Sequence, residues 1–121
     1  MRVQHKKWTN KLDKLFSLDT RSRGKCERCG KTSNLQTSHI YSRSYKELRW
    51  ERKNAFCLCA GCHFWWHKNP LEAVEFTKKE LGTKGCNWLK EKSRKSKQWF
   101  DEDYKKLEKK LCQKKERLIA F

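Results

Sequence analysis

The chain has 121 residues, with 31 Lys or Arg against 14 Asp or Glu, and its formal net charge is +17 at pH 7. A chain of this length is expected to form one domain with a small apolar core, because the fraction of surface buried on folding falls as chains become shorter. The positive excess favours a polyanionic partner, and nucleic acid is the first candidate.

Membrane association and disulfide bonding both fit the sequence poorly. No run approaches the ~18 apolar residues of a membrane-spanning helix, and neither a secretory signal nor a lipidation motif is evident. The 7 cysteines are an odd number with paired close spacings. That pattern favours metal-bound thiolates in a reducing compartment. We therefore expect a soluble, cytoplasmic protein with no membrane partner.

Residues 1–25 form a basic segment in which apolar residues recur at helical spacing. These residues are Trp8, Leu12, Leu15 and Phe16. We predict a short helix here that lays its apolar face on the core. Direct contact of this face with nucleic acid is the alternative.

Residues 26–70 predict a strand, a loop, a second strand and a helix. The run Leu35-Gln36-Thr37-Ser38-His39-Ile40 partly alternates apolar and polar residues, and Ala55-Phe56-Cys57-Leu58 suits a returning strand. Between them, residues 41–53 are polar and rich in Arg and Lys. After the second strand the chain is expected to turn into a helix that includes residues 63–67.

Residues 71–121 are predicted to form a basic helical region. Asn69 can cap its first helix, Pro70 suits the first helical position, and Gly82 is expected to end that helix. Asp101 is expected to cap a last helix with apolar residues near heptad spacing. These residues are Tyr104, Leu107, Leu111 and Leu118. We expect this helix to pack back on the domain, with a coiled-coil dimer as the alternative, so a monomer is favoured.

Two Cys-x2-Cys pairs predict a structural zinc site. The four residues are Cys26, Cys29, Cys59 and Cys62. Four thiolates can close a tetrahedron around Zn²⁺ and leave no open position for a substrate. Gly30 allows the turn with φ > 0 that brings the first pair onto one ion. Cys57 is an alternative ligand, but Cys59 repeats the spacing of the first pair and is preferred.

These motifs together resemble the HNH endonucleases of the ββα-metal class, and especially short, zinc-stapled phage-type members. The matching elements are Cys26-x2-Cys29, Leu35-Gln36-Thr37-Ser38-His39-Ile40, Asn54 and Leu58-Cys59-x2-Cys62-His63-x3-His67. The run Ser38-His39-Ile40, followed by Leu48-Arg49-Trp50 and Asn54-Ala55, is most similar to phage recombination-type HNH proteins. The resemblance covers residues 26 to about 70 and implies an α+β fold, a small ββα-metal core with flanking N-terminal and C-terminal helices. If the chain is phage-encoded, the host cytoplasm is its expected location.

The resemblance implies a divalent-metal-dependent endonuclease that hydrolyses DNA phosphodiester bonds. His39 then corresponds to the general base that activates water, a task suited to an imidazole with a pKa near neutrality. Asn54 corresponds to a residue that holds the loop or orients His39. His63 and His67 are expected to bind the catalytic Mg²⁺, Mn²⁺, Ni²⁺ or Zn²⁺, since residues four apart share one helical face. Many relatives have an Asp or His ligand at the position of Ser38, whose hydroxyl is a poor ligand.

Phosphate contacts from the loop between the strands are expected to hold the substrate. The basic residues of this loop are Arg43, Lys46, Arg49, Arg52 and Lys53. Such contacts position a duplex without reading its sequence. A non-catalytic, zinc-dependent nucleic-acid-binding module is the alternative function, and RNA is the alternative substrate.

Overall fold

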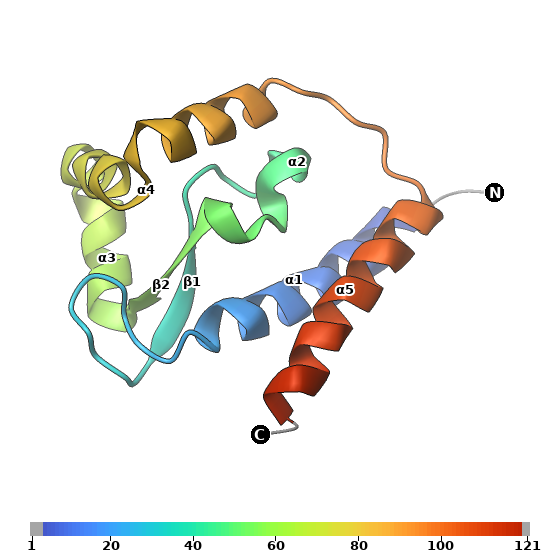
Figure 1. Ribbon diagram of the computed structural model, residues 1–121, viewed down its shortest axis with the longest axis horizontal. Coiled ribbons are helices and arrows are strands. Elements are labelled where there is room, and N and C mark those ends of the chain that lie inside the picture. Colours follow the sequence, from blue (N-terminus) through green and yellow to red (C-terminus); the bar gives the residue numbers. More distant parts are fainter. Residues whose placement is uncertain (1–3, 120–121) are drawn as a thin grey trace.

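The computed structural model describes residues 4–119, and the side chains of residues 4–115. Within this part of the chain the protein is a small α+β domain with five helices and a two-stranded antiparallel sheet (Figure 1). The elements are α1 (His5–Arg21), β1 (Leu35–His39), α2 (Lys46–Arg49), the 3-10 helix η1 (Arg52–Asn54), β2 (Ala55–Cys59), α3 (Ala60–Lys68), α4 (Pro70–Ser93) and α5 (Asp101–Ile119). The ends of the predicted terminal segments, residues 1–3 and 120–121, lie outside this description.

The hairpin and the helix after it follow the predicted order. β1 and β2 are antiparallel, with Leu35 opposite Cys59 and His39 opposite Ala55. All five residues of β2 are buried, because α1 packs on one face of the hairpin and α3 on the other. The long connection between the strands contains α2 and η1, and α3 begins directly after β2.

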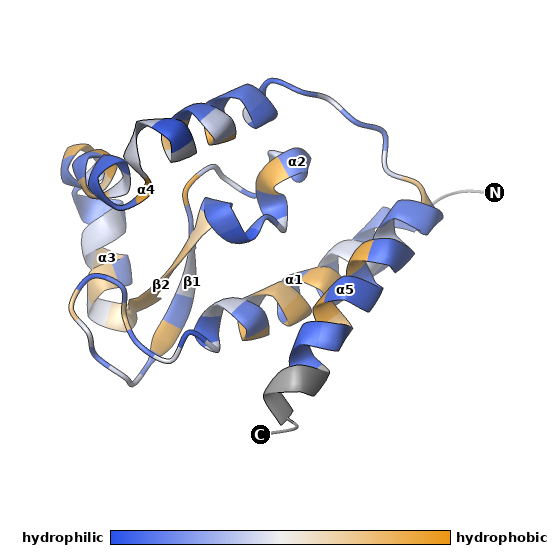
Figure 2. Cartoon of the chain, in the orientation of Figure 1, coloured by the Kyte–Doolittle hydropathy of each residue, from blue (hydrophilic) through white to orange (hydrophobic). Residues whose placement is uncertain are grey.

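The last helix packs against the first, as the apolar stripe predicts. Figure 1 shows α1 and α5 side by side, and the apolar residues of α1 in Figure 2 lie toward α5. The fully buried Tyr104 stacks on Trp8 and Trp99, with ring centroids 5.7 and 5.2 Å away. Its hydroxyl accepts a hydrogen bond from Nζ of Lys46 at 2.6 Å. The side chain of Leu118, also predicted for the stripe, is not among those described.

Gly82 interrupts α4, where the sequence predicts a stop. Its φ of 69° and ψ of 177° are not helical, so α4 is kinked at this residue. The chain then resumes a helical course to Ser93, within the region 71–121 that the sequence predicts to be helical.

Neither predicted helix cap makes the expected side-chain bond. Asn69 is the N-cap residue of α4 and Pro70 lies in its first turn, as predicted, but the Asn69 side chain donates to the carbonyl of Trp65 in α3 at 3.1 Å. The carboxylate of Asp101 accepts the indole N–H of Trp8 at 3.0 Å. At the start of α5, the carboxylate of Asp103 accepts the backbone N–H of Phe100 at 2.9 Å.

None of the helices within residues 4–119 is long and apolar enough to cross a membrane.

Candidate functional site

Four cysteines lie together where the first Cys-x2-Cys pair, Cys26 and Cys29, meets the junction of β2 and α3. The Sγ atoms of Cys26, Cys29, Cys59 and Cys62 all lie within 4.8 Å of one another. In each pair the backbone N–H of the second cysteine donates to the Sγ of the first at 3.5 Å. Gly30 has a φ of 81°, as predicted, and this turn brings the first pair together.

The cysteine cluster fits a tetrahedral Zn²⁺ ion. A Zn–S bond of about 2.3 Å places the sulfurs of a tetrahedron about 3.8 Å apart, and the Sγ atoms of Cys29 and Cys59 are 3.6 Å apart. Burial raises the pKa of Cys62, whereas backbone N–H donors outweigh burial and lower that of Cys26. Cys57 is buried outside the cluster, so the predicted preference for Cys59 is confirmed.

A cationic side chain that was not predicted from the sequence supports this cluster. The guanidinium of Arg28 donates to Sγ of Cys62 at 3.4 Å and lies 3.6 Å from the ring centre of Trp65. A positive charge beside a thiolate offsets the negative charge of a four-thiolate site. Its position inside the first Cys-x2-Cys spacing is the one signal in the sequence that could have indicated this role.

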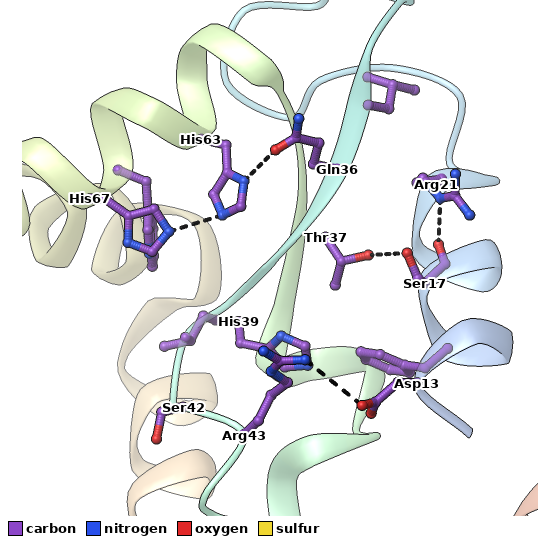
Figure 3. Close-up of a pocket in the computed structure, with 14 residues that line it drawn as sticks. Asp13, Ser17, Arg21, Gln36, Thr37, His39, Ser42, Arg43, His63 and His67 are labelled. Atoms are coloured by element: carbon purple, nitrogen blue, oxygen red, sulfur yellow. Dashed lines mark hydrogen bonds and ion pairs between the residues drawn. The ribbon is translucent and has the colours of Figure 1, made fainter. Parts of the chain in front are cut away.

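A separate cleft of about 810 Å³ lies along β1, between α1 and α3. Figure 3 shows His63 and His67 on the α3 side, His39 on the strand, and Asp13, Ser17 and Arg21 on the α1 side. The four clustered cysteines do not line this cleft. The structure thus separates the four clustered cysteines from the histidines, as expected from the sequence.

His63 and His67 form a close pair on one face of α3. Their Nε2 atoms are 3.0 Å apart, and Nδ1 of His63 lies 2.6 Å from Oε1 of Gln36 (Figure 3). Since the amide oxygen can only accept, Nδ1 carries the proton and Nε2 of neutral His63 keeps its lone pair. Burial and the nearby charges of His67 and His39 lower the pKa of His63, which favours this neutral form.

The spacing of the pair fits two nitrogen ligands of one divalent cation. Two nitrogens each about 2.1 Å from an ion lie about 3.0 to 3.4 Å apart for bond angles between octahedral and tetrahedral values. Gln36 orients His63 in the way that outer hydrogen-bond partners orient metal-binding histidines. Among the described side chains, no further His, Cys, Asp or Glu joins the pair to make three clustered ligands.

His39 enters the same cleft from the end of β1. Its Nε2 lies 3.0 Å from the carbonyl oxygen of Arg49, and its ring centroid is 5.5 Å from that of Phe16. Because a carbonyl can only accept, Nε2 carries the proton of the neutral ring and Nδ1 keeps a lone pair. Burial lowers the pKa of His39, and the hydrogen bond to Arg49 partly opposes this. The lowered pKa favours the neutral form of the imidazole near pH 7.

Asn54 is fully buried and holds the loop that follows β1. Its side-chain N–H groups donate to the carbonyls of Tyr41 and Leu48, each at 3.0 Å, and its Oδ1 accepts the N–H of Tyr41 at 2.8 Å. No hydrogen bond joins its amide to His39 among the described residues. Of the two roles expected for Asn54, the geometry corresponds to holding the loop.

Ser38 contributes no metal-binding atom to the cleft. The residue is fully buried, and its Oγ has no hydrogen-bond partner among the described residues. It pairs with Phe56 in the hairpin and does not line the cleft.

The predicted phosphate-binding residues do not share one surface. Arg43 lines the cleft, with a side chain that is 65% exposed. Lys46 and Arg49 are engaged inside the protein, by Tyr104 and Asp13 respectively. Arg52 and Lys53 line a different pocket. The cleft gains Arg21 instead, which no motif in the sequence indicates.

Comparison with known protein families, with curated proteins and with solved structures finds no match for this chain. The resemblance to the HNH endonucleases therefore rests on the motif residues alone.

Proposed function

We propose that this protein is a divalent-metal-dependent HNH endonuclease that hydrolyses phosphodiester bonds in DNA. One observation carries the proposal: His39, with a lone pair on Nδ1, lines the same cleft as the His63 and His67 pair. A base and a cation site beside one another are what phosphodiester hydrolysis requires. The order of strand, strand and helix around them supports the family assignment.

His39 is the general base in this proposal. Its Nε2–H is held by the carbonyl of Arg49, so Nδ1 takes the proton of the attacking water. The lowered pKa keeps this nitrogen unprotonated at neutral pH. Asn54 acts through the backbone, since it holds both ends of the loop that provides Leu48 and Arg49.

His63 and His67 hold the catalytic cation in this proposal, with Gln36 fixing the ring of His63. A divalent cation at this site would supply Lewis-acid stabilisation of the negative charge on the phosphate and the leaving oxygen. Arg21 and Arg43 are the cleft's guanidinium groups and can contact the phosphates on either side of the scissile bond.

Plasmid nicking tests this function directly. Zinc-loaded protein is incubated with supercoiled DNA and Mg²⁺, Mn²⁺ or Ni²⁺, and we expect open-circular or linear product with at least one of these ions. His39→Ala should abolish cleavage while leaving zinc content and DNA binding unchanged, because a base makes no contact that holds the duplex. His5→Ala is the matched control, since His5 lies outside the cleft.

Two results would contradict the proposal. DNA binding without cleavage under every ion would favour the non-catalytic zinc module, which uses the same cysteines and charge. Cleavage of a single-stranded RNA but not of DNA would show that the substrate is RNA and not DNA.

A further inference from the structure

Asp13 on α1 binds the side chains of two consecutive residues at the C-terminal end of α2, Arg49 and Trp50. Its Oδ1 accepts from Nε of Arg49 at 3.0 Å and from the indole N–H of Trp50 at 2.9 Å. Its Oδ2 accepts from Nη2 of Arg49 at 2.7 Å. The Arg49 guanidinium is thus held in a two-pronged carboxylate pair, which fixes direction as well as distance.

The carbonyl group between these two residues is the one that orients His39. The Arg49 carbonyl accepts from Nε2 of His39 at 3.0 Å, and the peptide group that contains it links Arg49 to Trp50. Because Asp13 holds the side chains on both sides of this peptide group, it restricts rotation of the carbonyl. Trp50 is 7% exposed, so packing adds to the restraint.

We infer that Asp13 is a positioning residue for His39, acting through Arg49 and Trp50; the inference rests on the proposed function of His39 as the base. Helix α1 lies outside the ββα unit, so the nuclease core depends on this added helix to fix its base. A shift of about 1 Å in a reacting group can reduce a rate about a hundredfold.

The charges around His39 support this role. Asp13 faces it from α1, Arg43 from the loop, Arg49 from α2 and His63 from α3. Burial raises the pKa of Asp13, but hydrogen bonds from Arg49 and Trp50 outweigh burial and lower it, so the carboxylate is charged at neutral pH. This negative charge raises the pKa of His39, whereas the two guanidinium groups lower it.

Steady-state cleavage by zinc-loaded Asp13→Asn tests the inference. We expect kcat to fall between about tenfold and about a hundredfold with little change in KM, because the base is displaced and the substrate contacts remain. The acidic limb of the pH–rate profile should move to lower pH, since loss of the carboxylate and of a well-placed Arg49 carbonyl both lower the pKa of His39. Asp13→Glu retains the carboxylate and should retain more activity than Asp13→Asn.

The matched control is Asp19→Asn on the same helix. Asp19 pairs with Lys114 of α5 at 3.7 Å and does not line the cleft. This variant should lose a different ion pair of α1 without moving the pH–rate profile. If Asp13→Asn does not fold, Arg49→Lys provides the second variant, because lysine keeps the charge but cannot form the two-pronged pair.

Nitrogen-15 NMR of the His39 ring gives a readout that does not depend on cleavage. We expect the Nε2–H tautomer in the native protein, and a mixture of tautomers with a lower pKa in Asp13→Asn. A folded Asp13→Asn protein with native kcat and an unchanged His39 tautomer and pKa would overturn the inference. If the native protein cleaves nothing, the proposed function fails, and the NMR comparison still decides whether Asp13 positions His39.

Discussion

His63 and His67 face each other across one turn of α3, with their Nε2 atoms 3.0 Å apart. In the absence of a cation, one ring must donate a proton to the other. When both lone pairs bind one ion, the same spacing becomes a ligand pair. Burial and the nearby charges of His67 and His39 lower the pKa of His63 and so favour its neutral form, and the bond to Gln36 selects the tautomer in which Nε2 keeps its lone pair.

The first prediction concerns this cation site. In zinc-loaded protein, we expect His63→Ala or His67→Ala to remove measurable binding of a further Ni²⁺ ion, because one imidazole alone holds the ion weakly. Gln36→Leu should weaken binding about tenfold to a hundredfold, the usual effect of losing an outer hydrogen-bond partner. Isothermal titration calorimetry measures both effects. Binding by His63→Ala as tight as that of the His5→Ala control would show that the ion lies elsewhere.

The second prediction concerns the pH dependence of cleavage. Only the unprotonated His39 ring can accept a proton, so the rate should rise with pH through the pKa of His39 and then level off. Since burial lowers that pKa from 6.5, the midpoint should lie below pH 6.5. Initial rates between pH 4.5 and pH 8 at constant ionic strength test this. A midpoint above pH 7 would rule out His39 as the titrating base.

The third prediction concerns removal of zinc. We expect one tightly bound zinc per chain. Chelation should unfold the hairpin and α3, because the four cysteines join the turn at Cys26 and Cys29 to the start of that helix. Circular dichroism during chelator titration measures the loss of helix. Cys62→Ser should abolish zinc binding, whereas Cys86→Ser, outside the cluster, should retain it. Native helix content after complete zinc removal would contradict a structural role.

The fourth prediction concerns Asn54. Asn54→Asp keeps the size of the side chain but replaces its NH2 group, whose two N–H bonds face the carbonyls of Tyr41 and Leu48, with a carboxylate oxygen. We expect the free energy of unfolding to fall by about 3 kcal/mol or more, because an oxygen would then face two buried carbonyls. Urea denaturation of zinc-loaded protein measures the change. The exposed Asn10→Asp is the control, and an equal effect at both sites would refute the role of Asn54 in the loop.

The fifth prediction concerns Ser38. Ser38→Ala removes a buried hydroxyl that has no partner among the described residues, so stability should stay the same or rise by about 1 kcal/mol. Cleavage should be unaffected, because Ser38 does not line the cleft. Thermal unfolding and plasmid nicking check the two statements. Loss of Ni²⁺ binding in this variant would show instead that the hydroxyl serves as a ligand.

Much of the hairpin and of the cysteine cluster could be predicted because the signals are local. Alternation in β1, the apolar run of β2 and the spacing of each cysteine pair depend on neighbours only a few residues apart. The N-cap position of Asn69 was predicted correctly, but the capping bonds expected from the side chains of Asn69 and Asp101 do not form. Asn69 bonds to the carbonyl of Trp65 and Asp101 bonds to the indole of Trp8, instead of to the first backbone N–H groups of α4 and α5. Capping propensities do not include such competing hydrogen-bond partners.

The clustering of the four cysteines and the shared face of His63 and His67 were predictable from the sequence, since both follow from fixed spacings in Cys-x2-Cys turns and helices. The set of charged residues that line the cleft, in contrast, depends on how distant segments pack together. Arg49, predicted to bind phosphate, is instead paired with Asp13, 36 positions away in the chain. That pairing depends on α1 packing against the hairpin, and contacts between such distant segments leave no periodic trace in the sequence.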